Sequence, residues 1–302
     1  MIVLLLFFAS GAGAQTIVPG GTISVDTIWT LEGSPYVVTG SVTVQGTDGD
    51  DGVTTLTIEP GVEVRFNSNR YLQIGSTSGA QGALVALGEE GSEVRFTTNS
   101  VDAQPGQWQG IWFYNTTEQS TTRMEHCIVE YASGAVRVMN AKATLVSCRF
   151  ANNSSYDLYY TGAVGGSVYN CSFNNGINFG GTGHVAFDNN QVYWNESYPV
   201  SMPADNVGTF VATTSFHGLG DRSALQVTGN RLSKSSIWKA SVPYVITSGQ
   251  NYFIVQGTDG TNGVTTLTIE PGAEIRFNTN RYLQIGSTSG AQGALVVLGE
   301  EG

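Results

Sequence analysis

A chain of 302 residues, of which 40% are hydrophobic, is long enough to bury a sizeable core, so wholesale disorder is not expected. Charged residues make up only 12% while glycine is abundant, and this composition favours short strands joined by tight turns over surface helices. The formal net charge of −11 argues against a nucleic-acid partner and an anionic membrane surface, because both require clustered Lys and Arg.

The first residues predict export. An apolar run from Ile2 to Phe8 leads to the small-residue site Ala12-Gly13-Ala14, and we interpret residues 1–14 as a secretory signal peptide. The Lys or Arg that normally precedes such a run is missing, so the alternatives are a start further upstream or a lipid-facing stub. The run is too short to span a bilayer, and no second segment is long and apolar enough to anchor the chain. We therefore expect a secreted or cell-surface protein with no membrane insertion after signal cleavage.

The acidic segment "GTDGDDGV" at Gly46–Val53 has two interpretations. Its carboxylates suggest a Ca²⁺ loop, but the spacing differs from an EF-hand loop, which has acidic or Asn residues at alternate positions before its Gly. A later copy of the segment reads "GTDGTNGV" and lacks two of the carboxylates. The sequence therefore favours a solvated turn and predicts no obligate metal site here.

From Thr54 onwards the sequence alternates with period two. Leu56 and Ile58 face one way and Thr57 the other, as in a half-buried strand. Pro60-Gly61 follows, and it fits the two central positions of a type II turn, because Pro presets φ and Gly accepts a positive φ. Each such corner would bend the chain onto a new face of a coil.

The tetrapeptide "EVRF" occurs at Glu63–Phe66 and again at Glu93–Phe96, which we interpret as the next coil. Stacking in register would place Phe66 beneath Phe96 in the core. The outward charges would then pair diagonally, Glu63 with Arg95 and Arg65 with Glu93.

The three cysteines lie about 20 residues apart in similar settings, "HCIVEYAS", "SCRFANNS" and "NCSFNNGI". A short period of alternating strands and Asn- or Gly-rich turns is the signature of a solenoid. We expect two inward stacks, Cys127/Cys148/Cys171 and Val129/Phe150/Phe173, with Asn190 and Val192 continuing them in "NNQVYWNE". Only His126 adjoins the cysteines, so a zinc site is not predicted. Parallel stacking suits disulfide geometry poorly, which favours reduced thiols; the alternative is a Cys127–Cys148 bond.

Aromatic residues concentrate between Tyr156 and Tyr198, interleaved with Asn and Asp. Sugar rings stack on such side chains while amides and carboxylates bind hydroxyl groups, so this region is a candidate carbohydrate-binding face. The alternative is that the rings fill or cover the coil. The candidate residues are Tyr156, Tyr159, Tyr160, Tyr193 and Trp194.

A long passage occurs twice. Gln45–Gly91 returns as Gln256–Gly302 with six changes. The differing pairs are Asp50/Thr261, Asp51/Asn262, Val62/Ala273, Val64/Ile275, Ser68/Thr279 and Ala86/Val297. We predict a first repeat unit at 15–236 and an incomplete second unit at 237–302, so that the chain is a fragment of a longer array. Its open end would fray or self-associate end to end.

Taken together, "SPYVVTGSVTV", "TLTIEPGVEVRF", "GQWQGIWF" and "HCIVEYASGAV" resemble the secreted bacterial right-handed parallel β-helix repeat proteins of the pectate-lyase-like fold. The resemblance covers nearly the whole mature chain and is clearest at Ser34–Asn175 and Pro243–Gly302. It implies an all-β fold, a right-handed parallel β-helix in which a single-stranded solenoid winds around one apolar channel. It also implies that ligands bind on an outer face.

Enzymes of this fold cleave polysaccharides, with Ca²⁺ and an Arg or Lys base in lyases and with paired Asp residues near a His in hydrolases. The nearest segments here are Phe216–Arg222 and Gly183–Asn190, and neither contains paired Asp, Gly-His-Gly or Arg-x-Pro-x-x-Arg. We assign no catalytic residue, metal ligand or cofactor. The expected function is a structural or adhesive one with polysaccharide as the partner; the alternative is a polysaccharide lyase or glycoside hydrolase.

Overall fold

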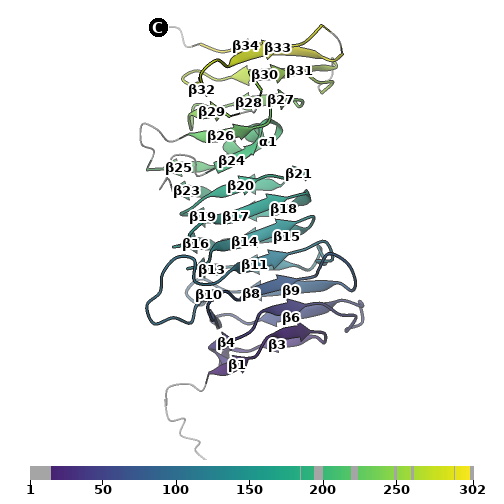
Figure 1. Ribbon diagram of the computed structural model, residues 1–302, viewed down its shortest axis with the longest axis vertical. Coiled ribbons are helices and arrows are strands. Elements are labelled where there is room, and N and C mark those ends of the chain that lie inside the picture. Colours follow the sequence, from purple (N-terminus) through teal and green to yellow (C-terminus); the bar gives the residue numbers. More distant parts are fainter. Residues whose placement is uncertain are drawn as a thin grey trace, which may run out of the picture.

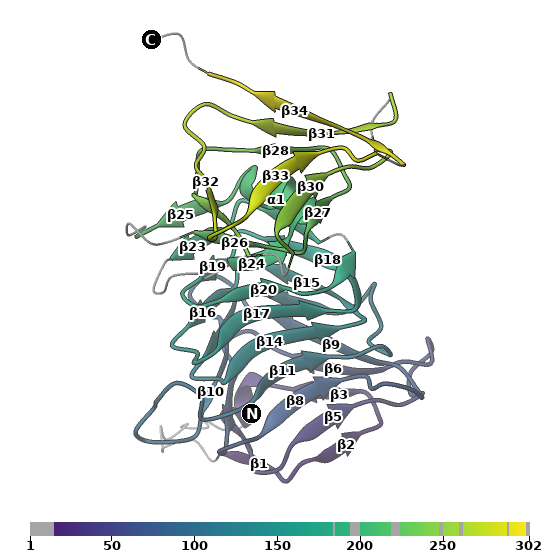
Figure 2. The ribbon, with the colours of Figure 1, turned by 45° about the horizontal axis from the view of Figure 1, so that its top comes forward.

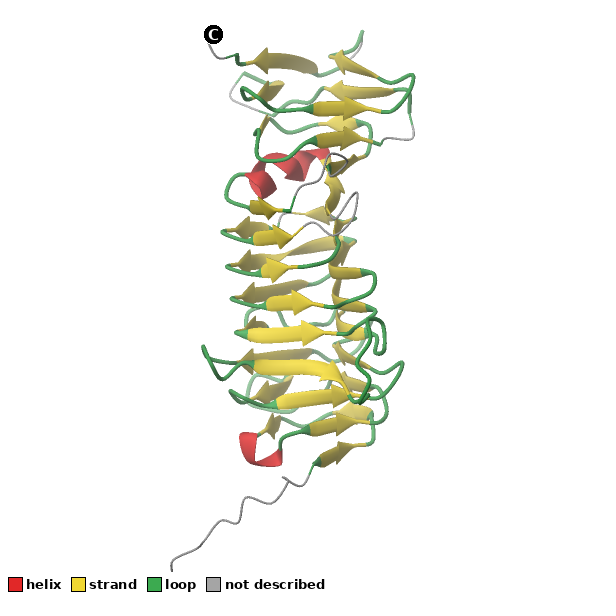
Figure 3. Cartoon of the chain, turned by 90° about the vertical axis from the view of Figure 1, so that its left-hand side faces the viewer, coloured by secondary structure: helices red, strands yellow, loops and turns green. Residues whose placement is uncertain are grey.

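The computed structural model describes residues 15–183, 185–193, 200–218, 224–247, 250–259, 262–288 and 290–299. In these residues the chain winds into one elongated stack of coils, and strands pair in parallel with the coils above and below (Figures 1 and 3). The predicted all-β parallel β-helix is confirmed. Residues 1–14, the predicted signal peptide, lie outside the described residues.

Three sheets, named here A, B and C, run along the stack. Sheet A comprises β1 (Thr16–Val18), β4 (Tyr36–Val38), β7 (Glu63–Phe66), β10 (Val94–Thr98), β13 (Cys127–Glu130), β16 (Arg149–Ala151), β19 (Ser172–Phe173), β23 (Gln191–Tyr193) and β25 (Ser215–His217). Sheet B comprises β2 (Gly21–Ile23), β5 (Val42–Val44), β8 (Tyr71–Ile74), β11 (Gly110–Phe113), β14 (Gly134–Met139), β17 (Tyr156–Thr161), β20 (Ile177–Phe179), β24 (Val200–Pro203), β26 (Leu225–Thr228), β29 (Tyr244–Ile246) and β32 (Ile275–Phe277). Sheet C comprises β3 (Thr27–Trp29), β6 (Thr54–Ile58), β9 (Gly82–Leu87), β12 (Arg123–Glu125), β15 (Lys142–Val146) and β18 (Ala163–Tyr169), on which β21 (Thr182–Gly183) and β22 (Ala186–Asp188) both pair. A short 3-10 helix, η1 (Leu31–Gly33), follows β3.

The period-two pattern fixes which side chains enter the core. In β6 the inward Leu56 and Ile58 are buried while Thr57 faces outward and is half-buried. The predicted turn follows, because the Val62 N–H donates to the Glu59 carbonyl at 3.3 Å and Gly61 has a φ of 76°. This corner carries the chain from sheet C to sheet A.

Both predicted inward stacks are confirmed. Val129, Phe150 and Phe173 are in register across β13, β16 and β19, and the two phenyl rings stack with centroids 4.9 Å apart. The three cysteines precede these strand positions, and all are buried free thiols. Asn190 continues the cysteine stack, where its side-chain oxygen accepts a hydrogen bond from the Cys171 N–H at 2.8 Å.

The predicted register of the two "EVRF" segments is wrong by two residues. Phe96 lies beside Val64, and Arg95 lies directly beside Glu63. The turn before β10 sets this shift. In that turn the backbone groups of Glu89 and Ser92 bond to each other, and the Ser92 carbonyl also accepts a backbone N–H from the corner of the coil below. A shift by two leaves the inward and outward faces unchanged.

The shifted register changes the side-chain contacts of β7 and β10. Phe66 stacks on Trp108, with ring centroids 4.1 Å apart and planes 6° apart. The diagonal ion pairs expected from the sequence are not formed. Instead Arg65 binds Glu63 of its own strand at 2.6 Å, and Arg95 binds Glu130 of the coil above.

One α-helix, α1 (Ala204–Val211), interrupts the coils after β24 (Figure 3). Its buried residues are Ala204, Val207, Phe210 and Val211. The Phe210 ring stacks on Phe187 of β22, with centroids 4.4 Å apart, so α1 packs on the core of the coils below it. The sequence pattern does not predict this helix.

Beyond α1 the coils continue with a different assignment of strands to sheets. By sequence, β26, β29 and β32 correspond to β1, β4 and β7 of sheet A, and the pairing of Tyr244 with Ile275 repeats that of Tyr36 with Val64. These strands nevertheless extend sheet B, because β26 pairs with β24. The remaining strands form two new sheets. Sheet D comprises β27 (Arg231–Leu232), β30 (Tyr252–Val255) and β33 (Tyr282–Ile285), and sheet E comprises β28 (Ser236–Trp238), β31 (Val264–Ile269) and β34 (Gln292–Val297).

Polar contacts fix this junction. The Asp205 carboxylate, in the first turn of α1, accepts the backbone N–H groups of Ser233 at 2.7 Å and Lys234 at 3.1 Å. At the other end of the helix, the Lys239 ammonium donates to the Ala212 carbonyl at 3.2 Å. The predicted division between residues 236 and 237 falls in β28, which lies along α1.

Candidate functional site

The outer face of sheet B carries a column of aromatic and polar side chains. Outward positions of successive strands are in register, and their inward neighbours are buried aliphatic residues such as Leu72 and Val136. The outward column runs through Gln73, Trp112, Arg137, Tyr159 and Asn178. It therefore forms a continuous surface feature along several coils.

Rings and a guanidinium group stack along this column. Tyr71 stacks on Trp112 with centroids 4.3 Å apart and planes 13° apart. The Arg137 guanidinium carbon lies 5.3 Å from the Trp112 centroid, 5.7 Å from that of Tyr156 and 5.6 Å from that of Tyr159. We call these five residues the aromatic strip. Each of them is partly exposed.

Two glycines allow close approach in the part of sheet B that carries the strip. A Cβ atom at Gly134 would lie 2.1 Å from Cζ of Tyr156, so the ring occupies the space where a side chain would project. Gly110 has a φ of 108°, and a Cβ atom there would lie 1.8 Å from the Gly134 carbonyl oxygen. These glycines begin β14 and β11: Gly134 leaves room for the Tyr156 ring, and Gly110 lets the backbones of the two strands approach closely.

The charge of Arg137 is not balanced by a carboxylate in the part of the chain that the structure describes. Arg137 Nε and Nη2 both donate to the Tyr156 hydroxyl, at 2.9 and 2.6 Å. Arg65, Arg95 and Arg123, in contrast, each bind a glutamate. Arg137 is therefore a fixed cation held among rings by cation–π contacts on a protein of net charge −11.

A polar pocket of about 210 Å³ lies at the corner that precedes Tyr71. Its lining residues are Asn67, Ser68, Thr98, Asn99, Ser100 and Gln107. Amide and hydroxyl groups of this kind both donate and accept hydrogen bonds, as recognition of sugar hydroxyl groups requires.

The five predicted carbohydrate-binding residues do not form one site. Tyr156 and Tyr159 belong to the aromatic strip. Tyr160 lies in the core, stacked on Phe179, and burial raises the pKa of its hydroxyl. Tyr193 is 37% exposed on sheet A, where it stacks on His217. Trp194 lies outside the described residues.

The sequence reasoning missed Tyr71, Trp112 and Arg137. They are far apart in the chain, and only the register between coils brings them together. Alignment of successive coils on their inward aliphatic residues would have been the signal that places them on one face.

Burial shifts the pKa of two titratable groups in the core, Asp157 and Cys127. Burial raises the pKa of Asp157 to about 6, although its carboxylate accepts the Asn153 side-chain N–H and the backbone N–H groups of Asn174 and Asn175. Burial also raises the pKa of the Cys127 thiol. Asp157 therefore acts as the hydrogen-bond acceptor of a buried corner between coils.

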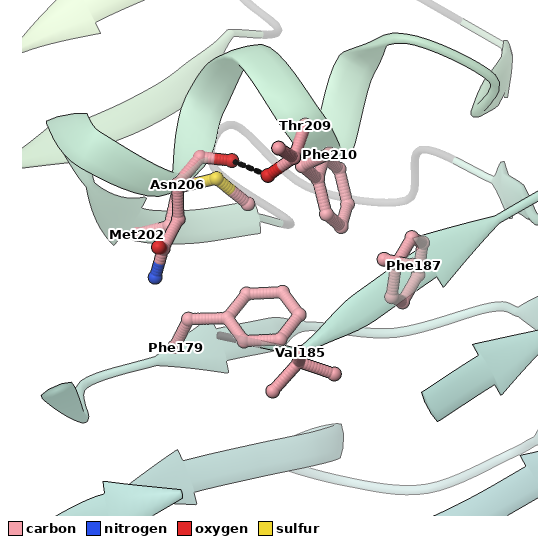
Figure 4. A pocket seen from close by; sticks show the side chains of 7 residues that line it. All are labelled: Phe179, Val185, Phe187, Met202, Asn206, Thr209 and Phe210. Atoms are coloured by element: carbon pink, nitrogen blue, oxygen red, sulfur yellow. Dashed lines mark hydrogen bonds between the residues drawn. The ribbon is translucent and has the colours of Figure 1, made fainter. Parts of the chain in front are cut away.

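A small cavity lies beneath α1, where Thr209 donates to the Asn206 carbonyl at 3.0 Å (Figure 4). Its lining residues are Phe179, Val185, Phe187, Met202, Asn206, Thr209 and Phe210. Its volume of about 10 Å³ leaves room for at most one water molecule, so it is too small to bind a ligand.

Among the described residues, no cluster of three or more His, Cys, Asp and Glu side chains is arranged to hold a metal ion. The same part of the chain contains no helix that is long and apolar enough to cross a membrane. Comparison with protein-family models, curated proteins and solved structures finds no match to the chain.

Proposed function

We propose that this chain is a secreted or cell-surface β-helix protein with a structural or adhesive role, and that it binds polysaccharide along the aromatic strip. The observation that carries the proposal is the stack of Tyr71, Trp112 and Arg137 with Tyr156 and Tyr159 on one outer face. The resemblance to the secreted pectate-lyase-like proteins supports an extracellular location and a carbohydrate partner.

The spacing of the strip supports an extended, repetitive ligand. Parallel strands lie about 4.8 Å apart, so rings on successive coils form a ladder. The spacing between its rings is short compared with the length of a polysaccharide, so one sugar chain can contact several rings. Aromatic faces pack against the C–H faces of sugar rings, while Gln73 and Asn178 at the two ends of the column can bind hydroxyl groups. The unbalanced charge of Arg137 favours a polysaccharide that carries carboxylate groups.

Affinity electrophoresis in gels that contain polygalacturonate, alginate, xylan or mixed-linkage β-glucan tests this function. We expect the wild-type chain to be retarded most by the two acidic polymers. Trp112→Ala should weaken binding about tenfold, since it removes the central ring of the strip. Arg137→Gln should abolish the preference for the acidic polymers.

Tyr193→Ala is the matched control, because it removes an exposed tyrosine of sheet A that lies outside the strip. It should bind as the wild type does. A wild-type chain that none of the four gels retards would disprove the proposed function. Incubation with the same polymers, followed by assays for reducing ends and unsaturated products, tests the alternative of a lyase or hydrolase.

A further inference from the structure

The second copy repeats the first ring of the strip on a different sheet. Tyr282 corresponds to Tyr71, begins β33 of sheet D and is 54% exposed. The neighbouring Gln284 donates to the Gly286 carbonyl at 2.9 Å, and Gln73 makes the same contact with Gly75 at 2.9 Å. The glutamine contact two residues after the tyrosine is thus the same in both copies.

A second ring has been added beside it. Tyr252 takes the place that Ser41 has in the first copy, in the segment "SGQNYF" that precedes the near-identical passage. Tyr252 pairs in register with Tyr282, and their ring centroids are 6.2 Å apart. The repeated passage that follows has only six changes, and none of them introduces an aromatic residue, so the added ring stands out.

Each copy therefore places a second ring beside the same tyrosine, stacked at 13° in the first copy and tilted by 39° in the second, and we call each of these ring pairs a platform. In the first copy the partner is Trp112 from the coil above, and in the second it is Tyr252 from the coil below. The two platforms lie on separate sheets, because sheet B continues from β24 into β26 and not into the strands of sheet D (Figure 2). A ligand that follows sheet B upward from Tyr159 meets Asn178 and Ser201, and the next strands of that sheet, β26, β29 and β32, do not contain Tyr252.

We propose that Tyr252 and Tyr282 form a second polysaccharide-binding site of the same class, so that one chain has two separate sites for sugar. This inference rests on the proposed function of the aromatic strip. A protein with two such sites cross-links polysaccharide chains, and it gains avidity on a surface that carries many of them.

The experiment uses hexasaccharides prepared from whichever of the four polysaccharides retards the chain most. Isothermal titration should give two hexasaccharides per wild-type chain. Tyr252→Ser restores the residue of the first copy, so it should fold, and it should weaken the second site about tenfold and reduce the measured stoichiometry towards one. Tyr71→Ala and Tyr282→Ala are a matched pair that should each impair one site and leave the other.

Agglutination of polysaccharide-coated beads gives a second readout. The wild type should agglutinate the beads, while Tyr252→Ser should bind them without agglutination. A wild-type stoichiometry of one that Tyr252→Ser leaves unchanged would overturn this inference and leave the proposed function standing. Absence of binding to all four polymers would overturn the proposed function, and the second site with it.

Discussion

The two copies of the repeated passage have nearly the same sequence and very different burial. Leu84 in β9 is completely buried, whereas its counterpart Leu295 in β34 is 37% exposed. At the next inward position Ala86 is completely buried and Val297 is 64% exposed. The strands have the same register in both copies, since Leu84 pairs with Leu56 and Leu295 pairs with Leu267.

What differs is the neighbour. β9 has β6 below it and β12 above it, whereas within the described residues β34 pairs only with β31. In a solenoid the stability of a coil is mainly the sum of its interfaces with the coils on either side. Leu84 and Leu295 therefore differ in one contribution to stability, the packing of the coil above, which only Leu84 has within the described residues.

The largest effect is expected from matched core substitutions. Leu84→Ala should lower the free energy of unfolding by about 3 kcal/mol, because it leaves a cavity between two coils. Leu295→Ala should lower it by less than about 1 kcal/mol, because the side chain has packing on one side only. Urea unfolding measures both. Equal losses would mean that another part of the protein, or a second copy of it, covers β34.

A second test concerns the open coil itself. Amide hydrogens of β34 should exchange about 100-fold faster than those of β9, since opening free energies fall towards zero at a frayed edge. Within the described residues β34 has one unpaired edge, and an exposed edge of this kind recruits other strands, so a chain that ends at Gly302 should self-associate end to end. Hydrogen exchange and sedimentation velocity measure the two properties.

A graft supplies the control for that test. Adding a copy of Ser92–Asn175 after Gly302 places the natural continuation of the first copy above β34. Exchange at Leu295 should then slow towards that at Leu84, and association should decrease. If the graft changes neither property, the edge is already covered in the native chain.

The sequence predicted those parts of the fold that depend on local patterns. Period-two alternation placed Leu56 and Ile58 inside, and the repeated cysteine setting placed Phe150 on Phe173 in the correct register. The predicted register of the two "EVRF" segments was wrong because it depends on the turn that Ser92 closes. Identical tetrapeptides do not reveal the structure of that turn. The sequence pattern therefore predicted which side chains of each strand face inward, but it did not determine the register between neighbouring strands.

The candidate site was predicted only in part for a related reason. The density of aromatics around Tyr156 pointed to two residues of the aromatic strip, but composition could not separate the outward Tyr159 from the buried Tyr160 next to it. The rings that complete the strip, Trp112 and Tyr71, lie two and three coils away. Helix α1 gave no signal either, since its role is to cover a core that exists only when the coils are stacked.

The smallest effect is expected at the acidic loops that begin the repeated passage. In the first copy Asp48 accepts the Asp26 N–H at 2.7 Å, and Asp51 accepts the Val53 N–H at 3.0 Å. The second copy makes the same two bonds, from Ser235 N–H to Asp259 at 2.7 Å and from Val264 N–H to the neutral Asn262 at 3.1 Å.

These paired bonds show that an amide replaces the Asp51 carboxylate in the same turn, so the loop uses the oxygen as an acceptor and does not depend on its charge. Asp51→Asn should therefore change the free energy of unfolding by less than about 0.5 kcal/mol, as expected for a surface substitution that keeps its hydrogen bond. Removal of Ca²⁺ with a chelator should leave the melting temperature of wild type and variant unchanged. Differential scanning calorimetry with and without chelator makes both measurements. A fall of many degrees that occurs in the wild type and disappears in Asp51→Asn would identify Gly46–Val53 as a Ca²⁺ site, and it would show that the two copies differ in chemistry as well as in burial.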